Sequence, residues 1–167
     1  MRKWKEVLLF MYGRGSWYGD PLAEVEGLTE DQLFWTPSDN CLPIIWHVGH
    51  IAHRERVHIG KFLQALPEPV VPPAFRVFGA EWTGLEQIKS AISSVEELFS
   101  WVRQVRQESI SYISGLGEED FHSAAPTLQD EMTVAHWLLN TAAHTALHIG
   151  RIQLLRAMLE GRQEPPC

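Results

Sequence analysis

The chain has 167 residues, of which 45% are hydrophobic and 21% are charged, and this is the profile of one globular domain rather than of a disordered segment. Acidic residues outnumber basic ones by 21 to 14, and no basic cluster is present to neutralise phosphates, which excludes an ordinary nucleic-acid-binding surface. Because no apolar run reaches the ~18 residues of a membrane span and no signal-peptide pattern opens the chain, we expect a cytoplasmic protein without membrane partners.

Helical signals follow one another from the start of the chain, and no alternating strand pattern interrupts them. A first helix is expected over Lys3–Leu22. Thr29, with Gln32 three residues later, predicts an N-capped short helix. A second long helix is expected over Pro43–Leu66, since proline is tolerated in a first helical turn.

The second half of the chain starts with an extended connection, which is enforced by Pro67, Pro69, Pro72 and Pro73. Ser93 and Ser94 each precede a glutamate by three residues, which is typical of a capping box, and a third helix is expected from there to Ser114. Thr133 is a good N-cap for a last helix that reaches Glu160. Four long helices with apolar stripes predict an all-α fold, an up-and-down four-helix bundle that spans residues 1–167 as one domain.

The two cysteines, Cys41 and Cys167, are too few for a disulfide framework and form no metal-binding pair. The chain does contain eight histidines, and neutral imidazole is the commonest metal ligand in proteins. The arrangement of these histidines is therefore the feature of the sequence that bears most on function.

The last helix carries the segment His144-Thr145-Ala146-Leu147-His148. Positions four apart on a helix differ by about 40°, so both imidazoles leave the same side of the helix and can reach one metal ion at ~2.0–2.1 Å. The same face holds Val134, Trp137, Thr141, Ile152, Leu155 and Leu159. The pair is therefore expected in the stripe that faces the core, where it fits either a metal ion or two histidines hydrogen-bonded to other helices.

The second helix contains Trp46-His47-Val48-Gly49-His50 and, further on, His58. His50 lies roughly opposite the apolar stripe of this helix, which is formed by Ile44, Ile45, Val48, Ala52, Ile59, Phe62, Leu63 and Leu66. Either the histidine side is solvated, or the helix buries two faces and one of them lines a polar cleft. By spacing alone, His47, His50 and His58 are nearly equal candidates for a third ligand.

These motifs, Trp46-His47-Val48-Gly49-His50 and His144-x-x-x-His148-Ile-Gly, together resemble the DinB/YfiT-like family. The first resembles in particular the DinB-type domain at the start of ergothioneine-forming sulfoxide synthases, and the resemblance spans almost the whole chain. In that family one histidine of the second long helix joins the pair of the last, and the matching positions are His50, His144 and His148. The resemblance thus implies one divalent metal ion, nickel or zinc, with iron and cobalt as further possibilities.

The other histidines and polar residues are not expected to be metal ligands. We expect His53, His58, His122 and His136 to lie at the surface or to cap a helix. His47 is a candidate to hydrogen-bond a ligating imidazole, and Asn140 either lines the cleft or makes a structural hydrogen bond. Glu55 lies about 140° round the helix from His50, so the sequence offers no clear general base.

Three neutral ligands leave a coordination position open, as in catalytic zinc sites, and such an ion lowers the pKa of a bound water or thiol. The DinB/YfiT-like family, which this chain resembles, includes bacterial thiol S-transferases that use bacillithiol or mycothiol. It also includes a mycothiol-dependent isomerase and proteins described as metal-dependent hydrolases. The resemblance therefore implies a thiol S-transferase acting on an electrophilic small molecule in detoxification or stress response. A hydrolase and a non-catalytic metal- or small-molecule-binding stress protein are the alternatives. The family's tendency to pair, together with the wide apolar stripe of the second helix, predicts a homodimer.

Overall fold

The computed structural model of the protein describes residues 3–13, 19–80, 82–127 and 132–161, so Cys167 and part of the expected first helix lie outside it. The regular elements in this part of the chain are helical, which confirms the all-α prediction. They are α1 (Trp4–Tyr12), the 3-10 turn η1 (Ala23–Val25), α2 (Glu30–Phe34), α3 (Ile44–Glu55), the π-helical η2 (Arg56–Leu63), the 3-10 segment η3 (Pro73–Gly79), α4 (Leu85–Ala91), α5 (Val95–Gly115), the 3-10 turn η4 (Glu119–His122) and α6 (Val134–Leu159). No helix among the described residues is long and apolar enough to cross a membrane.

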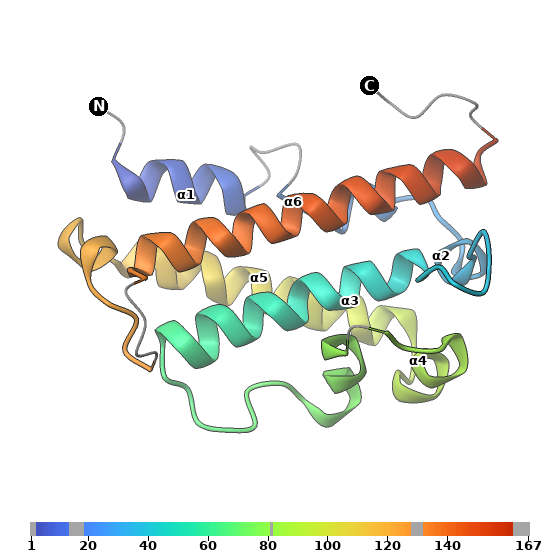
Figure 1. Ribbon diagram of the computed structural model, residues 1–167, viewed down its shortest axis with the longest axis horizontal. Helices are drawn as coiled ribbons and strands as arrows, with labels where there is room; N and C mark the ends of the chain where they lie inside the picture. The colour runs from blue at the N-terminus through green and yellow to red at the C-terminus, as the bar shows by residue number, and fades with distance from the viewer. Residues whose placement is uncertain (1–2, 14–18, 81, 128–131, 162–167) are drawn as a thin grey trace.

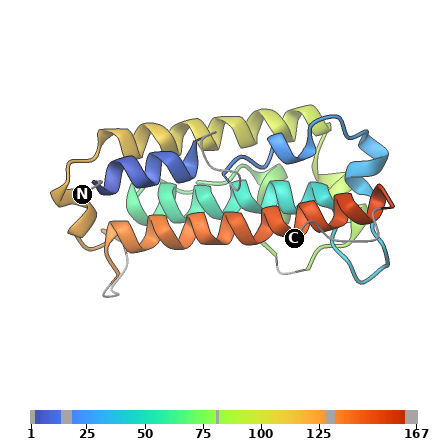
Figure 2. The same ribbon diagram turned by 90° about the horizontal axis from the view of Figure 1, so that it is seen from above.

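The long helices lie side by side in a bundle, with α1 and α6 running in one direction and α3 and α5 in the other (Figures 1 and 2). The chain reaches this arrangement because residues 64–94 carry it back along the bundle after η2. The consecutive long helices α3 and α5 therefore run parallel, and this pair departs from the up-and-down order that we predicted. The proline-rich start of this connection, residues 67–72, is without helix as expected. The rest of it contains η3 and α4, which the sequence pattern did not predict.

The ends of three helices follow the capping residues that the sequence indicated. The Thr29 hydroxyl accepts from the backbone N–H of Gln32 at 3.3 Å and opens α2. Ser94 accepts from the N–H of Glu97 and opens α5, and Thr133 caps α6, which closes at Gly161 with φ +67°.

The first helix is shorter than predicted, and the expectation that it reaches Leu22 is wrong. It ends at Tyr12, because Gly13 takes extended backbone with ψ 178°. Residues 20–22 form a turn instead of a helix, in which the Leu22 N–H donates to the carboxylate of Asp20 at 3.0 Å.

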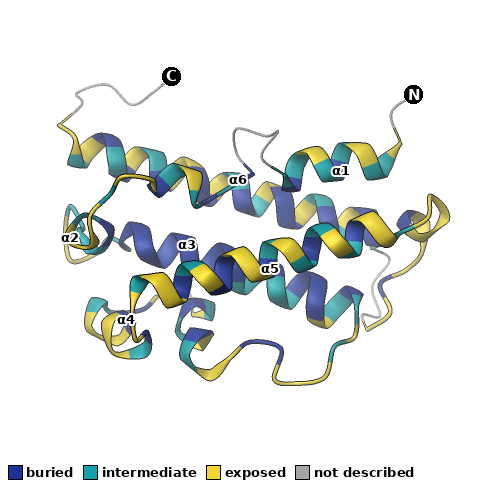
Figure 3. Ribbon diagram, turned by 180° about the vertical axis from the view of Figure 1, so that it is seen from behind, coloured by how far each residue is buried: buried dark blue, intermediate teal, exposed yellow. Residues whose placement is uncertain are grey.

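The helix α3 is buried on nearly all sides, as its dark blue ribbon shows (Figure 3). Every residue from Pro43 to Ala52 is buried, since the helix packs on α6, α5 and η3. The alternative in which this helix buries two faces is therefore the correct one. It continues without a break into η2, whose wider hydrogen-bond spacing is seen where the Gln64 N–H donates to the Ile59 carbonyl at 2.9 Å.

The core consists of two apolar clusters with buried polar side chains between them. Of the residues on α6, one cluster contains Ile149, Ile152 and Leu155, and the other contains Val134, Ala135, Leu138 and Ala142. The buried polar residues of α6 lie at the junction of these two stretches, namely Thr141, Thr145 and His148. Ser109 of α5, and Glu55 and His58 of α3 and η2, likewise lie between residues of the first cluster and residues of the second along their own helices.

Candidate metal centre

Three histidine side chains converge where α3 packs against α6. His50 comes from α3, and His144 and His148 come from α6, one turn apart. Each offers one ring nitrogen, and these three nitrogens lie within 4.8 Å of one another. The ring centroids are 4.5 to 5.0 Å apart in all three pairs. The structure thus brings together the three residues that the family resemblance indicated.

The spacing of two of these nitrogens matches that of two ligands of one ion. The Nε2 atoms of His50 and His144 lie 3.2 Å apart. Two imidazole nitrogens that are each ~2.0–2.1 Å from one ion, at tetrahedral or octahedral angles, are about 2.9–3.4 Å from each other. The donor set therefore fits a divalent ion.

The backbone carbonyl of Phe78 in η3 orients His50. The carbonyl oxygen lies 2.7 Å from the His50 Nδ1, and because a carbonyl can only accept, Nδ1 carries the hydrogen and Nε2 keeps its lone pair. Phe78 reaches this position because Gly49 precedes His50: a Cβ atom at position 49 would lie 2.5 Å from the Phe78 ring. The glycine of the Trp-His-Val-Gly-His motif therefore has a packing role in placing the histidine's acceptor.

Two neighbours on α3 support the cluster. The Nδ1 of His47 lies 2.9 Å from the Nδ1 of His148, so the hydrogen bond expected of His47 is present, and the Nε2 of His148 is left for the cluster. The indole of Trp46 stacks on the His50 ring, with centroids 4.3 Å apart and planes inclined by 18°. Both contacts restrict the rotation of the imidazoles.

The three imidazoles are uncharged at neutral pH. Burial lowers the pKa of His50 to about 3 and that of His148 to about 2, and it also lowers the pKa of His144. Two cationic side chains, Arg54 and Arg151, act in the same direction. The lone pairs that a metal ion requires are therefore available without loss of a proton.

His58 is buried, so the expectation that it lies at the surface or caps a helix is wrong. Its Nδ1 is 2.9 Å from the hydroxyl of Thr141, and that hydroxyl donates its only hydrogen to the Trp137 carbonyl at 2.8 Å. The Nδ1 of His58 must therefore be the donor, and its Nε2 keeps the lone pair. Its ring centroid is 6.4 Å from that of His144, outside the group of three.

The other histidines divide into two groups. His53 is half-buried, with an enclosed Nδ1 that has no hydrogen-bond partner among the described residues, so the surface expectation is wrong for it as well. His122 is exposed, and His136 is exposed and accepts from the N-cap backbone of α6 at 3.2 Å, both as expected. Asn140 is exposed on α6.

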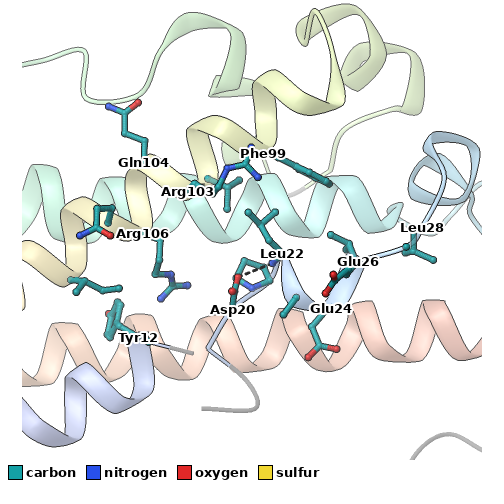
Figure 4. Close-up of a pocket in the computed structure, with 18 of the residues that line it drawn as sticks. Tyr12, Asp20, Leu22, Glu24, Glu26, Leu28, Phe99, Arg103, Gln104 and Arg106 are labelled. Carbon is teal, nitrogen blue, oxygen red and sulfur yellow. Dashed lines mark hydrogen bonds between the residues drawn. The ribbon is translucent and has the colours of Figure 1, made fainter. Parts of the chain in front are cut away.

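Glu55 faces α5 and not the three histidines. Its carboxylate lies 3.0 Å from the guanidinium of Arg106, and burial raises its pKa. Arg106 also contributes to the wall of a cavity of about 1240 Å³ between α5 and the η1 region, opposite Glu24 and Glu26 (Figure 4). None of the three converging histidines lines this cavity, which is therefore distinct from the candidate metal centre.

The residue that sequence reasoning missed is Phe78, because it acts through its backbone carbonyl and so has no side-chain signature. The sequence signal for this contact was a pair of glycines, Gly49 and Gly79, where α3 meets η3. A Cβ atom on Gly79 would lie 2.5 Å from the Nε2 of His53, just as one on Gly49 would meet the Phe78 ring. Two glycines outside turns indicate that η3 and α3 approach closely.

An all-α bundle in which the second and last long helices bring three neutral imidazoles together offers a set of ligands that could hold one metal ion. The family model of the DinB superfamily matches residues 20–152, a stretch that includes all three histidines. The chain belongs to the DinB superfamily. No curated protein matches it.

Proposed function

We propose that His50, His144 and His148 hold one divalent metal ion, nickel or zinc in preference to iron or cobalt, and that the protein is a metal-dependent thiol S-transferase. The observation that carries this proposal is the convergence of three imidazole nitrogens within 4.8 Å, on two buried rings, His50 and His148, and one half-buried ring, His144. Three protein ligands leave positions open, as in catalytic rather than structural zinc sites.

A bound divalent ion would lower the pKa of a thiol or a water molecule that reaches it. The protein's own residues hold the donor set: the Phe78 carbonyl and His47 fix the tautomers of the rings, and Trp46 excludes water from one face of His50. In the proposed reaction a sulfur–carbon bond forms between the thiol and an electrophilic small molecule. The leaving group departs with its electron pair, and the thiol proton passes to solvent. Detoxification or stress response is the setting that we propose.

The test is to load the purified protein with zinc or nickel and to incubate it with a panel of thiols and an alkyl or aryl chloride. The sulfur-linked product is measured by mass spectrometry. The His144→Ala and His148→Ala variants serve as metal-free controls, and His136→Ala serves as a control on the same helix. Hydrolysis of ester or amide substrates without any thiol would instead identify a metal-dependent hydrolase. Stoichiometric metal without turnover of either kind would identify a binding protein.

We also propose that the protein is a homodimer, formed through α6. The apolar stripe of α3 is buried within the protomer and cannot serve a second copy. On α6, Leu147, Leu154 and Met158 share one face and are 46 to 55% exposed. An isologous contact needs a self-complementary patch, and an antiparallel pair of α6 helices would place the exposed apolar side chains of one protomer against those of the partner subunit. The small residues Ala143 and Gly150 on this face permit close approach.

A further inference from the structure

The two helices that carry the histidines are unusual in their charge. The chain as a whole has a net charge of −7, yet α6 contains no aspartate or glutamate. The only acidic residue of α3 and η2 is Glu55, which is buried and paired with Arg106 on the far side of the helix. Nothing acidic on these helices therefore faces the histidine cluster.

Two arginines lie on the histidine side of these helices. Arg54 is four residues after His50 on α3, and Arg151 is three residues after His148 on α6, so each lies on the same side of its helix as the histidine before it. Neither makes an ion pair or a hydrogen bond with any other residue that the structure describes, whereas Arg56, Arg103, Arg106 and Arg156 all pair with glutamates.

The arginines lie on opposite sides of the cluster along the bundle axis. The helices α3 and α6 are antiparallel (Figure 1). Each arginine follows its histidine in the sequence, so Arg54 and Arg151 are displaced from the histidines in opposite directions along the bundle. Arg54 is displaced from His50 by about 6 Å along its helix, and Arg151 from His148 by about 4.5 Å along its own. Electrostatics agree with this placement, since both arginines lower the pKa of His144, and only Arg151 acts on His47.

We propose that Arg54 and Arg151 are specificity-determining residues that select an anionic small molecule, a thiol with a carboxylate, for the metal centre. This proposal rests on the proposed function, in which the sulfur of the thiol substrate approaches the three histidines. With a divalent ion in place, the histidine side of α3 and α6 would carry two arginines without a described partner and no carboxylate. A carboxylate a few bonds from the sulfur can pair with either guanidinium, and such bidentate pairs are among the stronger hydrogen-bonded contacts.

The test compares 3-mercaptopropionate with its methyl ester, which has the same sulfur and chain but no charge. Each is titrated into cobalt-loaded protein, and binding is followed by the absorption band that a thiolate gives when it ligates cobalt. We expect the acid to bind about 10-fold or more tightly than the ester in the unaltered protein, as charge-assisted hydrogen bonds predict. Arg54→Gln and Arg151→Gln should reduce this ratio and leave the affinity of the ester unchanged.

Arg103→Gln is the matched control, because Arg103 is an exposed arginine on α5 that pairs with Glu96, and it should keep the full ratio. Equal affinities of acid and ester in the unaltered protein would overturn the inference while leaving the proposed function in place. If neither thiol changes the cobalt spectrum, the thiol-transfer proposal fails. In that case the binding of succinate to the zinc-loaded protein, measured by calorimetry, tests the arginine site separately. Binding that is lost in the Arg54→Gln/Arg151→Gln double variant supports the site, and an absence of binding overturns it.

Discussion

His47 and His148 face each other through their Nδ1 atoms, which lie 2.9 Å apart. Only one of the two rings can supply the hydrogen of this bond, so the tautomers of the two rings depend on each other. When His148 donates, its Nε2 has the lone pair that a metal ion needs, and His47 is the acceptor that stabilises this tautomer. The pair therefore connects a residue outside the proposed ligand set to the metal affinity of the site.

Substitution of the histidines should consequently produce two levels of damage. His50→Ala, His144→Ala and His148→Ala should each abolish tight metal binding, because two imidazoles remain. His47→Ala should weaken binding by about 10–100-fold, as is typical for a residue that orients a ligand. Metal content after dialysis and affinity by chelator competition measure both effects, with the exposed His136→Ala as control. Retention of metal by all three alanine variants would place the site elsewhere.

Gly49→Ala should destabilise the protein although alanine favours helices. The added Cβ would lie 2.5 Å from the Phe78 ring, and such overpacking costs about 1–3 kcal/mol, against about 1 kcal/mol gained in helix propensity. Urea unfolding measures the difference. Gly115→Ala is the control, since nothing lies within 4 Å of its added Cβ. In a Phe78→Leu background the cost should shrink, and an unchanged cost there would refute the contact as its cause.

The metal-free protein should lose stability as the pH falls below neutral. Burial holds the pKa of His58 at about 4, against about 6.5 in an unfolded chain. Between these values the unfolded chain binds a proton that the folded protein does not, so the free energy of unfolding is highest above about pH 6.5 and declines toward pH 4. Urea midpoints at about pH 7.5 and pH 5 test this. The decline should be smaller in His58→Gln, whose amide still donates to Thr141.

Leu154→Glu should convert the proposed dimer into a monomer, because it places a charge in the centre of the exposed apolar face of α6. Sedimentation velocity at micromolar concentration measures the change. Phe10→Glu is the matched control, since Phe10 is also a large exposed apolar residue, at 54%, but lies on α1. A stable monomer in the unaltered protein, or an equal response to both substitutions, would contradict the assignment of the interface to α6.

Local chemistry explains which parts of the fold could be predicted from the sequence. Thr29, Ser94 and Thr133 open helices because each hydroxyl satisfies an N–H three residues later, and this requires no tertiary contact. The direction of α5 could not be predicted, because it depends on how residues 64–94 pack on α3. The end of α1 at Tyr12 was missed because the apolar pattern does not stop at Gly13.

The candidate site was predictable in part for a similar reason. The positions of His144 and His148 on one helix face follow from their spacing alone. The choice of His50 over His47 and His58 does not, because α3 is buried on both sides and all three rings are enclosed. What distinguishes His50 is the Phe78 carbonyl, 28 positions away in the chain. The family resemblance supplied this choice where periodicity could not.

The contacts that assemble the histidine cluster are among the most distant in the sequence. His50 meets His144 across 94 positions, and His47 meets His148 across 101. Closing loops of this length costs chain entropy before any contact compensates for it, so such contacts form late in folding. A nascent chain that ends before Thr133 has only one of the three proposed ligands. A metal ion should therefore slow the unfolding of the finished molecule while leaving its folding rate unchanged.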